Sequence, residues 1–370
     1  MRDVSIYVHI PFCAGKCGYC DFLSVVGGDF GGYVDALCAE IAAKSGDFGD
    51  CFVPTIFFGG GTPTILPIMH IAQIISSIRA NFRLIDEVKI SIEANPESIC
   101  TEKLAGLVGL GFNRISIGVQ SFIDSHLAAI GRIHNGREAI DSIKHARAAG
   151  FVDINLDLIF GLPNQSIRDF ADDLQTAISL HPTHIATYSL TIEDDTPMAA
   201  NPAILAALPD EQTERQMYHM AREFLEKNGY AQYEISNFAK AGYACEHNRR
   251  YWLGREYIGF GAGAASFIRH ARYTNSQNLA TYTAGDFAPS DHHQLTPRDQ
   301  AAEYAILRLR LTEGLSPADY YKNFQSDFCA THAKTLAALA ADGLITQTPS
   351  RIALTPLGMD LSNLVFCEFI

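Results

Sequence analysis

The chain has 370 residues, of which 48% are hydrophobic and 19% are charged, a composition typical of a globular protein with two or three domains or one large barrel with additions. Its formal net charge of −13, without long basic runs, argues against nucleic acid as a partner. No apolar run reaches the roughly 18 to 20 residues that span a bilayer, and the first residues lack signal-peptide features, so we expect a cytoplasmic protein that does not span the membrane.

Six β-branched or aromatic runs predict strands, at 4–10, 53–58, 88–94, 114–119, 153–160 and 184–190. Helical patterns lie between them, at 33–44, 68–82 and 137–150, and Gly150 suits the C-terminal cap of the last one. Apolar strands that alternate with helices predict a parallel sheet covered by helices. Six such units fall short of the eight of a complete barrel, so we predict an α/β fold built on a six-stranded partial (β/α)6 barrel.

Glycine and polar residues gather directly after these strands. A cysteine-rich loop follows the first, GGGTPT (59–64) the second and EANPE (93–97) the third, and VQSF, GLPNQ and YSLTIE follow the remaining three. Because the carboxyl ends of parallel strands meet at one edge, where such folds bind ligands, we expect one shared site.

The pattern changes after about residue 297 to helices, a short hairpin-like stretch at 345–355 and a last helix. This order predicts a winged-helix-like module. From Thr296 to the C-terminus there are six Lys or Arg against eight Asp or Glu, which favours a packing or lid role over DNA binding. We therefore divide the chain into a barrel (1–235), a connecting segment packed on it (236–296) and a C-terminal module (297–370).

Three cysteines, Cys13, Cys17 and Cys20, stand on the loop after the first strand. In a reducing compartment, cysteines are ligands, catalysts or buried apolar groups more often than disulfide partners. A zinc site would need a fourth ligand, and none nearby has suitable spacing. An iron–sulfur cube held by three cysteines leaves one iron open for a small molecule, and we prefer this interpretation to a zinc site or to three structural cysteines.

The Cys-x3-Cys-x2-Cys spacing resembles that of the radical S-adenosylmethionine family, whose fold is a six-stranded partial barrel. The resemblance implies that the cysteines bind a 4Fe-4S cluster and that S-adenosylmethionine takes the fourth iron. An electron from the cluster then breaks a carbon–sulfur bond and produces a 5′-deoxyadenosyl radical. Longer stretches, among them IYVHIPFC, TIFFGGGTPT, NRISIGVQSF and LDLIFGLPNQ, resemble the oxygen-independent coproporphyrinogen III oxidase-like branch, most closely its heme chaperones.

The same resemblance implies nine residues that contact S-adenosylmethionine or cover the cluster: Tyr7, Tyr19, Gly60, Gly61, Thr62, Glu93, Gln120, Arg132 and Asp157. Three glycines in a row also let a backbone approach a ligand closely, although a tight turn needs them too. Plainer roles stay open for Arg132 as a helix-end cation, for Asp157 as a partner of backbone groups and for Tyr19 as a surface aromatic. His9 is expected to orient the loop, and His292 and His293 to lie in a loop.

Two further stretches distinguish the branch's functions. The decarboxylating members carry another cysteine soon after the third, whereas this chain continues Cys20-Asp21-Phe22, as the chaperones do. HNRRYW (247–252) matches the chaperones' heme motif. The match implies His247 as the axial ligand of heme iron, with Tyr251 and Trp252 against the porphyrin and the two arginines near its propionates.

One position departs from the chaperone pattern, since Ala265 stands where they often have histidine. The resemblance therefore implies a heme chaperone with a 4Fe-4S cluster and exchangeable S-adenosylmethionine. Its partners would be heme, an electron donor and a heme-acceptor protein, with a respiratory acceptor and transient membrane association both open. The alternative is an enzyme that decarboxylates coproporphyrinogen III to protoporphyrinogen IX.

Overall fold

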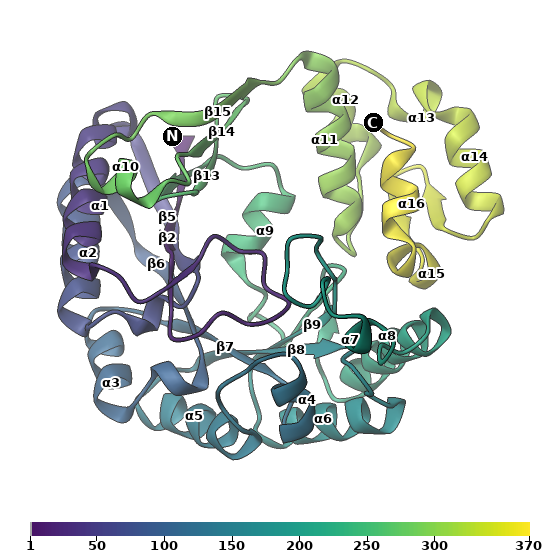
Figure 1. The fold of residues 1–370 in the computed structure, drawn as a ribbon. Coiled ribbons are helices and arrows are strands. Elements are labelled where there is room, and N and C mark those ends of the chain that lie inside the picture. The colour runs from purple at the N-terminus through teal and green to yellow at the C-terminus, as the bar shows by residue number, and fades with distance from the viewer. Residues whose placement is uncertain (1) are drawn as a thin grey trace.

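The computed structural model describes residues 2–370, and its centre is a sheet of six parallel strands (Figure 1). Neighbours in the sheet follow chain order, with each strand pairing in parallel with the next. The strands are β2 (Ser5–Ile10), β5 (Cys51–Gly60), β6 (Arg83–Ala94), β7 (Arg114–Gln120), β8 (Asp153–Phe160) and β9 (His184–Ser189). All six predicted strands are confirmed.

Further strands extend the sheet at both edges. Beside β9 lie β11 (Asn237–Ala239) and β10 (Ala231–Gln232), and beside β2 lie β12 (Tyr257–Phe260), β13 (Ala265–Ile268), β14 (Ala271–Asn275) and β15 (Pro289–Gln294). The path runs from β10 to β15, so the barrel is partial, as predicted. His292 and His293 lie in β15, not in a loop as expected, because this exposed edge strand needs no apolar face to pair with β14.

Helices cover the outer face of the parallel strands (Figure 1). They are α1 (Phe30–Lys44), α2 (Ile68–Asn81), α3 (Thr101–Gly109), α4 (Asp124–Ala129), α5 (Gly136–Ala148), α6 (Ile167–Ser179) and α8 (Glu211–Lys227). In α2 the buried residues Ile71, Ile74, Ile75 and Ile78 recur at helical spacing and form one apolar stripe. Gly150 follows α5 with a φ of +108°, which confirms its predicted capping role.

Alternation along β2 separates the outer core from the interior of the barrel. Ile6, Val8 and Ile10 are fully buried in the main hydrophobic core. Tyr7 and His9 point to the other face of the sheet, where the Tyr7 hydroxyl lies 3.1 Å from His9 Nδ1. Helix α9 (Glu246–Trp252) lies on this inner side of the barrel (Figure 1). The strands therefore supply both the support of the site and part of its lining.

The C-terminal module stands beside the barrel opening (Figure 1). It consists of α11 (Pro297–Arg310), α12 (Pro317–Phe324), α13 (Phe328–Thr331), α14 (Ala333–Ala341), β16 (Ile345–Thr348), β17 (Arg351–Leu354), α15 (Pro356–Asp360) and α16 (Ser362–Cys367). The predicted hairpin is confirmed as β16 and β17. Arg310 stacks on the Trp252 ring at 4.3 Å, and Arg215 pairs with Asp360 at 2.9 Å, so the module packs on the barrel.

Short elements complete the fold: β1 (Arg2–Asp3), β3 (Phe12–Cys13), β4 (Val25–Val26), α7 (Pro202–Leu205), α10 (Leu279–Thr283) and the 3-10 turns Ser45–Phe48, Pro63–Ile65 and Pro96–Ser98. Across residues 2–370, none of the helices combines the length and the apolarity needed to cross a bilayer.

Candidate functional site

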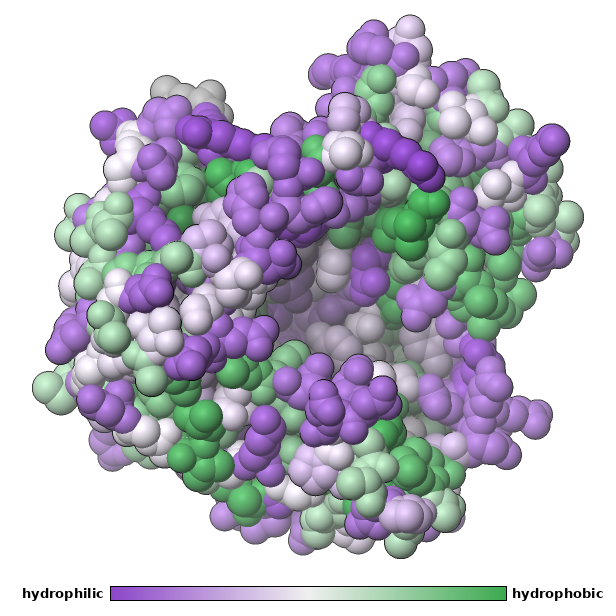
Figure 2. Space-filling view, turned by 45° about the horizontal axis from the view of Figure 1, so that its top comes forward, coloured by the Kyte–Doolittle hydropathy of each residue, from purple (hydrophilic) through white to green (hydrophobic). Residues whose placement is uncertain are grey.

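A pocket of about 420 Å³ opens at the carboxyl ends of the parallel strands. Figure 2 shows it as a hollow in the middle of that face, with hydrophilic residues around its rim. All six strands or the loops that follow them contribute to its lining, so the predicted shared site is present. Of the residues expected at the cluster and S-adenosylmethionine, all but Tyr7 line this pocket, namely Cys13, Cys17, Tyr19, Cys20, Gly60, Gly61, Thr62, Glu93, Gln120, Arg132 and Asp157.

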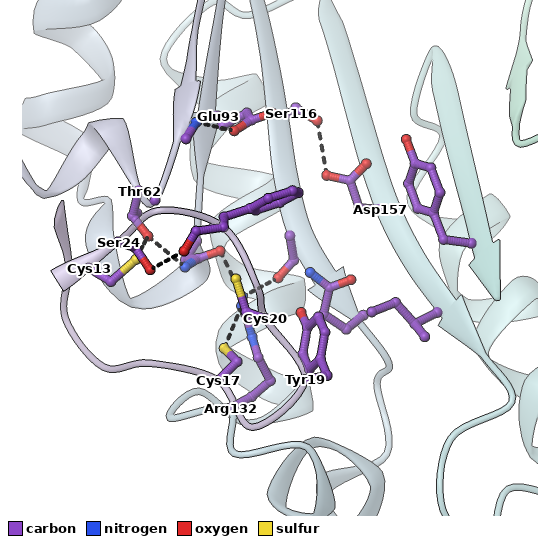
Figure 3. Close-up of a pocket in the computed structure, with 18 of the residues that line it drawn as sticks. Cys13, Cys17, Tyr19, Cys20, Ser24, Thr62, Glu93, Ser116, Arg132 and Asp157 are labelled. Carbon is purple, nitrogen blue, oxygen red and sulfur yellow. Dashed lines mark hydrogen bonds between the residues drawn. The ribbon is translucent and has the colours of Figure 1, made fainter. Parts of the chain in front are cut away.

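The cysteine loop between β3 and β4 crosses this opening and is held from the barrel interior (Figure 3). His9 Nε2 donates to the Leu23 carbonyl at 3.0 Å, and this bond leaves Nδ1 to accept from the Tyr7 hydroxyl at 3.1 Å. On the other side, Gly18 N–H donates to the Ile130 carbonyl. The expected orienting role of His9 is confirmed, and Tyr7 acts on the loop through it.

Two donors approach the thiols, Thr62 from the turn after β5 and Arg132 from the connection between α4 and α5 (Figure 3). Thr62 Oγ1 lies 3.6 Å from Cys13 Sγ, and Arg132 Nη1 lies 3.4 Å from Cys17 Sγ. Arg132 also donates to Asn95 Oδ1 and to the Gly118 carbonyl, both at 2.7 Å. Donors directed at sulfur hold the side chains of a ligand loop in position.

The three thiols do not converge on one point. Within residues 2–370 no three Cys, His, Asp or Glu side chains come together as closely as the ligands of a single ion. A four-iron cube binds its cysteines through separate iron atoms, so its ligands stand farther apart than those of one zinc ion.

The glycine turn after β5 packs against the cysteine loop. Gly60 has a φ of +114°, and a Cβ added there would lie 2.7 Å from the His9 ring. At Gly61 an added Cβ would lie 2.7 Å from the Phe12 carbonyl oxygen and 2.9 Å from Cys13 Sγ. Both positions require glycine for this close approach, whether or not a ligand is bound.

Two half-buried carboxyl groups, Glu93 and Asp157, face the pocket (Figure 3). Burial, together with the charge of Asp157, raises the pKa of Glu93 to about 8, although Gly60 N–H donates to its Oε2 at 3.2 Å. Burial also raises the pKa of Asp157, against hydrogen bonds from Ser116 at 3.0 Å and Asn155 at 2.8 Å. A ligand with positive charge would stabilise both carboxylates.

Gln120 and Tyr19 complete the lining. Gln120 ends β7 with a φ of +64° and is almost fully buried. Tyr19 packs on a small apolar cluster that contains Ile130 and Met198. Tyr19 is therefore partly buried and is not a free surface aromatic.

The HNRRYW stretch forms helix α9, whose His247 points into the interior and is only 2% exposed. Its Nδ1 lies 2.8 Å from Thr55 Oγ1, its Nε2 lies 2.8 Å from the Tyr251 hydroxyl, and its ring stacks on Phe57 at 5.1 Å. Burial, and then the positive charges of Arg250 and Arg114, lower the pKa of His247 to about 3. Both ring nitrogens are thus engaged within the protein, and the imidazole is neutral.

One of the two arginines of this stretch, Arg250, differs from expectation. Arg250 is 7% exposed, with its guanidinium on Ser5 and 2.9 Å from Asp3, so it does not face a propionate. The reason is its place on the face of α9 that packs on the first strand. Arg249 is partly exposed. Its guanidinium lies 3.4 Å from the exposed Glu313 carboxylate, so this side chain stays at the surface.

A second cavity, of about 310 Å³, lies beside α9 and was not predicted. We call it the aromatic cleft. Its lining comes from four parts of the fold: Tyr7 of β2; Tyr251, Trp252 and Gly254 at α9; Tyr257, Ala265, Phe267 and Arg272 of β12 to β14; and Leu307 of α11. Tyr251 and Trp252 of the HNRRYW stretch were its sequence signal. The strand pairing that brings the other lining residues together is not visible in the sequence.

Comparison with known proteins gives the following similarities. Residues 7–177 match the model of the radical SAM superfamily, and residues 295–361 match the HemN C-terminal domain. The heme chaperone HemW of Bacillus subtilis is 36% identical over 99% of both chains, and that of Escherichia coli K12 is 35% identical over 86% of both. Among solved structures, the radical SAM enzyme coproporphyrinogen III oxidase (HemN) of Escherichia coli superposes with a TM-score of 0.89 at 29% identity, covering 100% of this chain and 90% of the other.

Proposed function

Because the chain belongs to the heme chaperone HemW family within the radical SAM superfamily, we propose that it binds heme and delivers it to an acceptor protein. The observation that carries this proposal is the aromatic cleft beside α9. Its volume falls in the range of cofactor pockets, and its lining is aromatic with one arginine. Flat apolar faces suit a porphyrin, and a cation suits its propionates.

Heme in this cleft would contact the residues that the sequence motif singled out. Tyr251 and Trp252 line the cleft, and His247 stands directly behind Tyr251. Ala265, the position that departs from the chaperone pattern, opens onto the same cleft. We propose that the His247–Tyr251 pair holds the iron and that Arg272, now paired with Glu303 at 2.6 Å, is the cation nearest a propionate.

The first pocket would hold a 4Fe-4S cluster on Cys13, Cys17 and Cys20, with S-adenosylmethionine beside it. The donor set fits, since three thiols on one loop have a hydroxyl and a guanidinium directed at two of the sulfurs. When bound, the cluster supplies one-electron reduction of S-adenosylmethionine, and an electron donor is then needed. Glu93 and Asp157 would meet the cationic cofactor, Gly60 and Gly61 would let it approach the backbone, and Thr62, Gln120 and Tyr19 would form the walls.

We propose that the chain works in the cytoplasm and passes heme to a protein of respiration. The cleft is closed on one side by Leu307 of the C-terminal module, so a small movement of that module would widen the exit for heme.

Coproporphyrinogen decarboxylation is the second candidate, since the full chain superposes on a coproporphyrinogen III oxidase. Against it stands Cys20-Asp21-Phe22, which lacks the further cysteine. Porphyrin chemistry and heme transfer call for different assays.

Heme titration of the purified chain tests the proposal. We expect a saturable Soret shift at one heme per chain, which His247→Ala weakens and Lys334→Ala, a change on the far module, does not. The reconstituted protein, supplied with a reductant and S-adenosylmethionine, should leave coproporphyrinogen unchanged. Formation of protoporphyrinogen, or heme uptake without saturation, would contradict the proposal.

A further inference from the structure

His247 and Tyr251 form a hydrogen-bonded pair whose direction is set by the groups around it. Thr55 Oγ1 donates to Ser5 Oγ at 2.9 Å, and Ser5 Oγ also accepts from Arg250 Nε. Since the Thr55 proton points to Ser5, Thr55 Oγ1 must accept from the Nδ1–H of His247. A neutral imidazole has one N–H, so Nε2 keeps its lone pair and accepts the proton of the Tyr251 hydroxyl.

With the hydrogen bonds in this direction, the Tyr251 oxygen keeps lone pairs that are free to bind a metal, whereas neither nitrogen of His247 is free. Within residues 2–370 the Tyr251 hydroxyl has no hydrogen bond besides the one to His247. Tyr251 lines the aromatic cleft, whereas His247 lies behind it and is 2% exposed. An iron atom that enters the cleft therefore meets a phenol oxygen before it can meet an imidazole nitrogen.

The imidazole is also fixed in place. Turning it toward the cleft would break the hydrogen bonds to Thr55 and Tyr251 and the stacking on Phe57. A buried polar group that loses its partners is costly, so the ring has no easy route to the iron.

We propose that the phenolate oxygen of Tyr251 is the axial ligand of ferric heme in the aromatic cleft and that His247 is a positioning residue that holds the phenol by accepting its hydrogen bond. The inference rests on the proposed heme-binding function and names the ligand atom. When ferric heme that carries a hydroxide ligand binds, the O–H bond of Tyr251 breaks and a bond between iron and the phenol oxygen forms. The hydroxide takes the phenol proton and leaves the iron as water, and the iron stays ferric. Tyrosinate is a known axial ligand of heme iron, and an anionic oxygen suits the ferric state.

Resonance Raman spectroscopy of the full chain with one equivalent of ferric heme tests this ligand. We expect phenolate vibrations that shift when the protein carries ring-deuterated tyrosine. Tyr251→Phe should abolish them and weaken heme binding by more than tenfold. Loss of a group that only supports a metal ligand costs roughly 10- to 100-fold, and loss of the ligand itself should cost at least as much.

Tyr257→Phe is the matched control. Its ring also lines the cleft, 4.5 Å from that of Tyr251, but its hydroxyl accepts from Arg272 and has no bond to a histidine. We expect this variant to keep the phenolate bands. His247→Ala should keep them too, with heme affinity about 10- to 100-fold lower, because the support of the ligand is lost.

Two results would overturn the inference. One is a wild-type complex with a histidine-ligated spectrum that persists in Tyr251→Phe, which would leave heme binding in place but assign the iron to His247. The other is a wild-type chain that takes up no heme saturably, which would remove the proposed function itself. Circular dichroism of each variant separates a lost ligand from a lost fold, and the isotope shift in the wild-type chain needs no variant.

Discussion

Replacing Glu93 by glutamine should stabilise the cofactor-free protein at alkaline pH. The folded chain holds the pKa of Glu93 at about 8, against an ordinary value of 4.5, chiefly through burial. Between these two pH values the folded protein keeps a proton that the unfolded chain has lost, so stability falls as the pH rises through this window. The difference corresponds to about 5 kcal/mol. Because the barrel mouth admits water, which hydrates the carboxylate, we expect about half of that penalty.

Thermal unfolding at pH 5.5 and pH 8.5 measures this effect. At pH 8.5 Glu93→Gln should melt about 3 to 4 °C above the wild type. At pH 5.5, which lies only one unit above the ordinary pKa of 4.5, the gain should shrink to about a third of that. Glu102→Gln, which changes an exposed carboxylate in the first turn of α3, is the control and should show no such pH-dependent gain. An equal difference at both pH values, or a less stable variant at pH 8.5, would refute the reasoning.

The same carboxyl group should make S-adenosylmethionine binding depend on pH. If the cationic cofactor pairs with ionised Glu93, its affinity for the wild type rises toward pH 8 by up to about tenfold per pH unit and then levels off. Glu93→Gln should bind weakly and without this rise in isothermal titration. A pH profile shared by both proteins would assign the dependence to another group.

Three further substitutions test other parts of the site. Cys17→Ser should prevent the visible iron–sulfur absorption after anaerobic reconstitution, whereas Cys100→Ser, at an exposed thiol, should not; equal spectra would exclude Cys17 as a ligand. Gly60→Ala should lower the unfolding free energy by about 2 kcal/mol or more, because its Cβ meets the His9 ring at positive φ. Gly229→Ala, with open space around it, should cost less. Equal losses in a denaturant titration would contradict the steric account. Thr55→Val should destabilise the protein by about 1 to 3 kcal/mol in the same assay, because it removes the hydrogen-bond partner of Ser5 and His247 in the interior. An unchanged unfolding midpoint would contradict the role of these hydrogen bonds.

The parallel strands and the pocket at their ends were predictable from the sequence because they depend on local patterns. Continuous apolar runs specify buried strands, and parallel pairing brings the residues that follow them to one edge. Gly150 and the spacing of the three cysteines likewise act within a few positions of the chain. Such features need little knowledge of distant contacts.

The aromatic cleft could not be predicted in this way. It exists because β12 pairs with β2, more than two hundred residues away, and because α11 then covers the opening. The surroundings of His247 and Arg250 depend on the same long-range packing, since Ser5 and Thr55 come from the first two barrel strands. A motif can name residues that belong together, but the hydrogen bonds that decide their roles come from the fold.

Fluorescence of Trp252, the only tryptophan of the chain, tests the central claim that heme binds in the aromatic cleft. Heme quenches tryptophan by energy transfer, which falls steeply with distance, and Trp252 lines the cleft. We predict near-complete quenching that saturates at one heme per chain and coincides with the Soret change. Saturable heme uptake with only partial quenching would contradict the claim and place heme elsewhere on the protein.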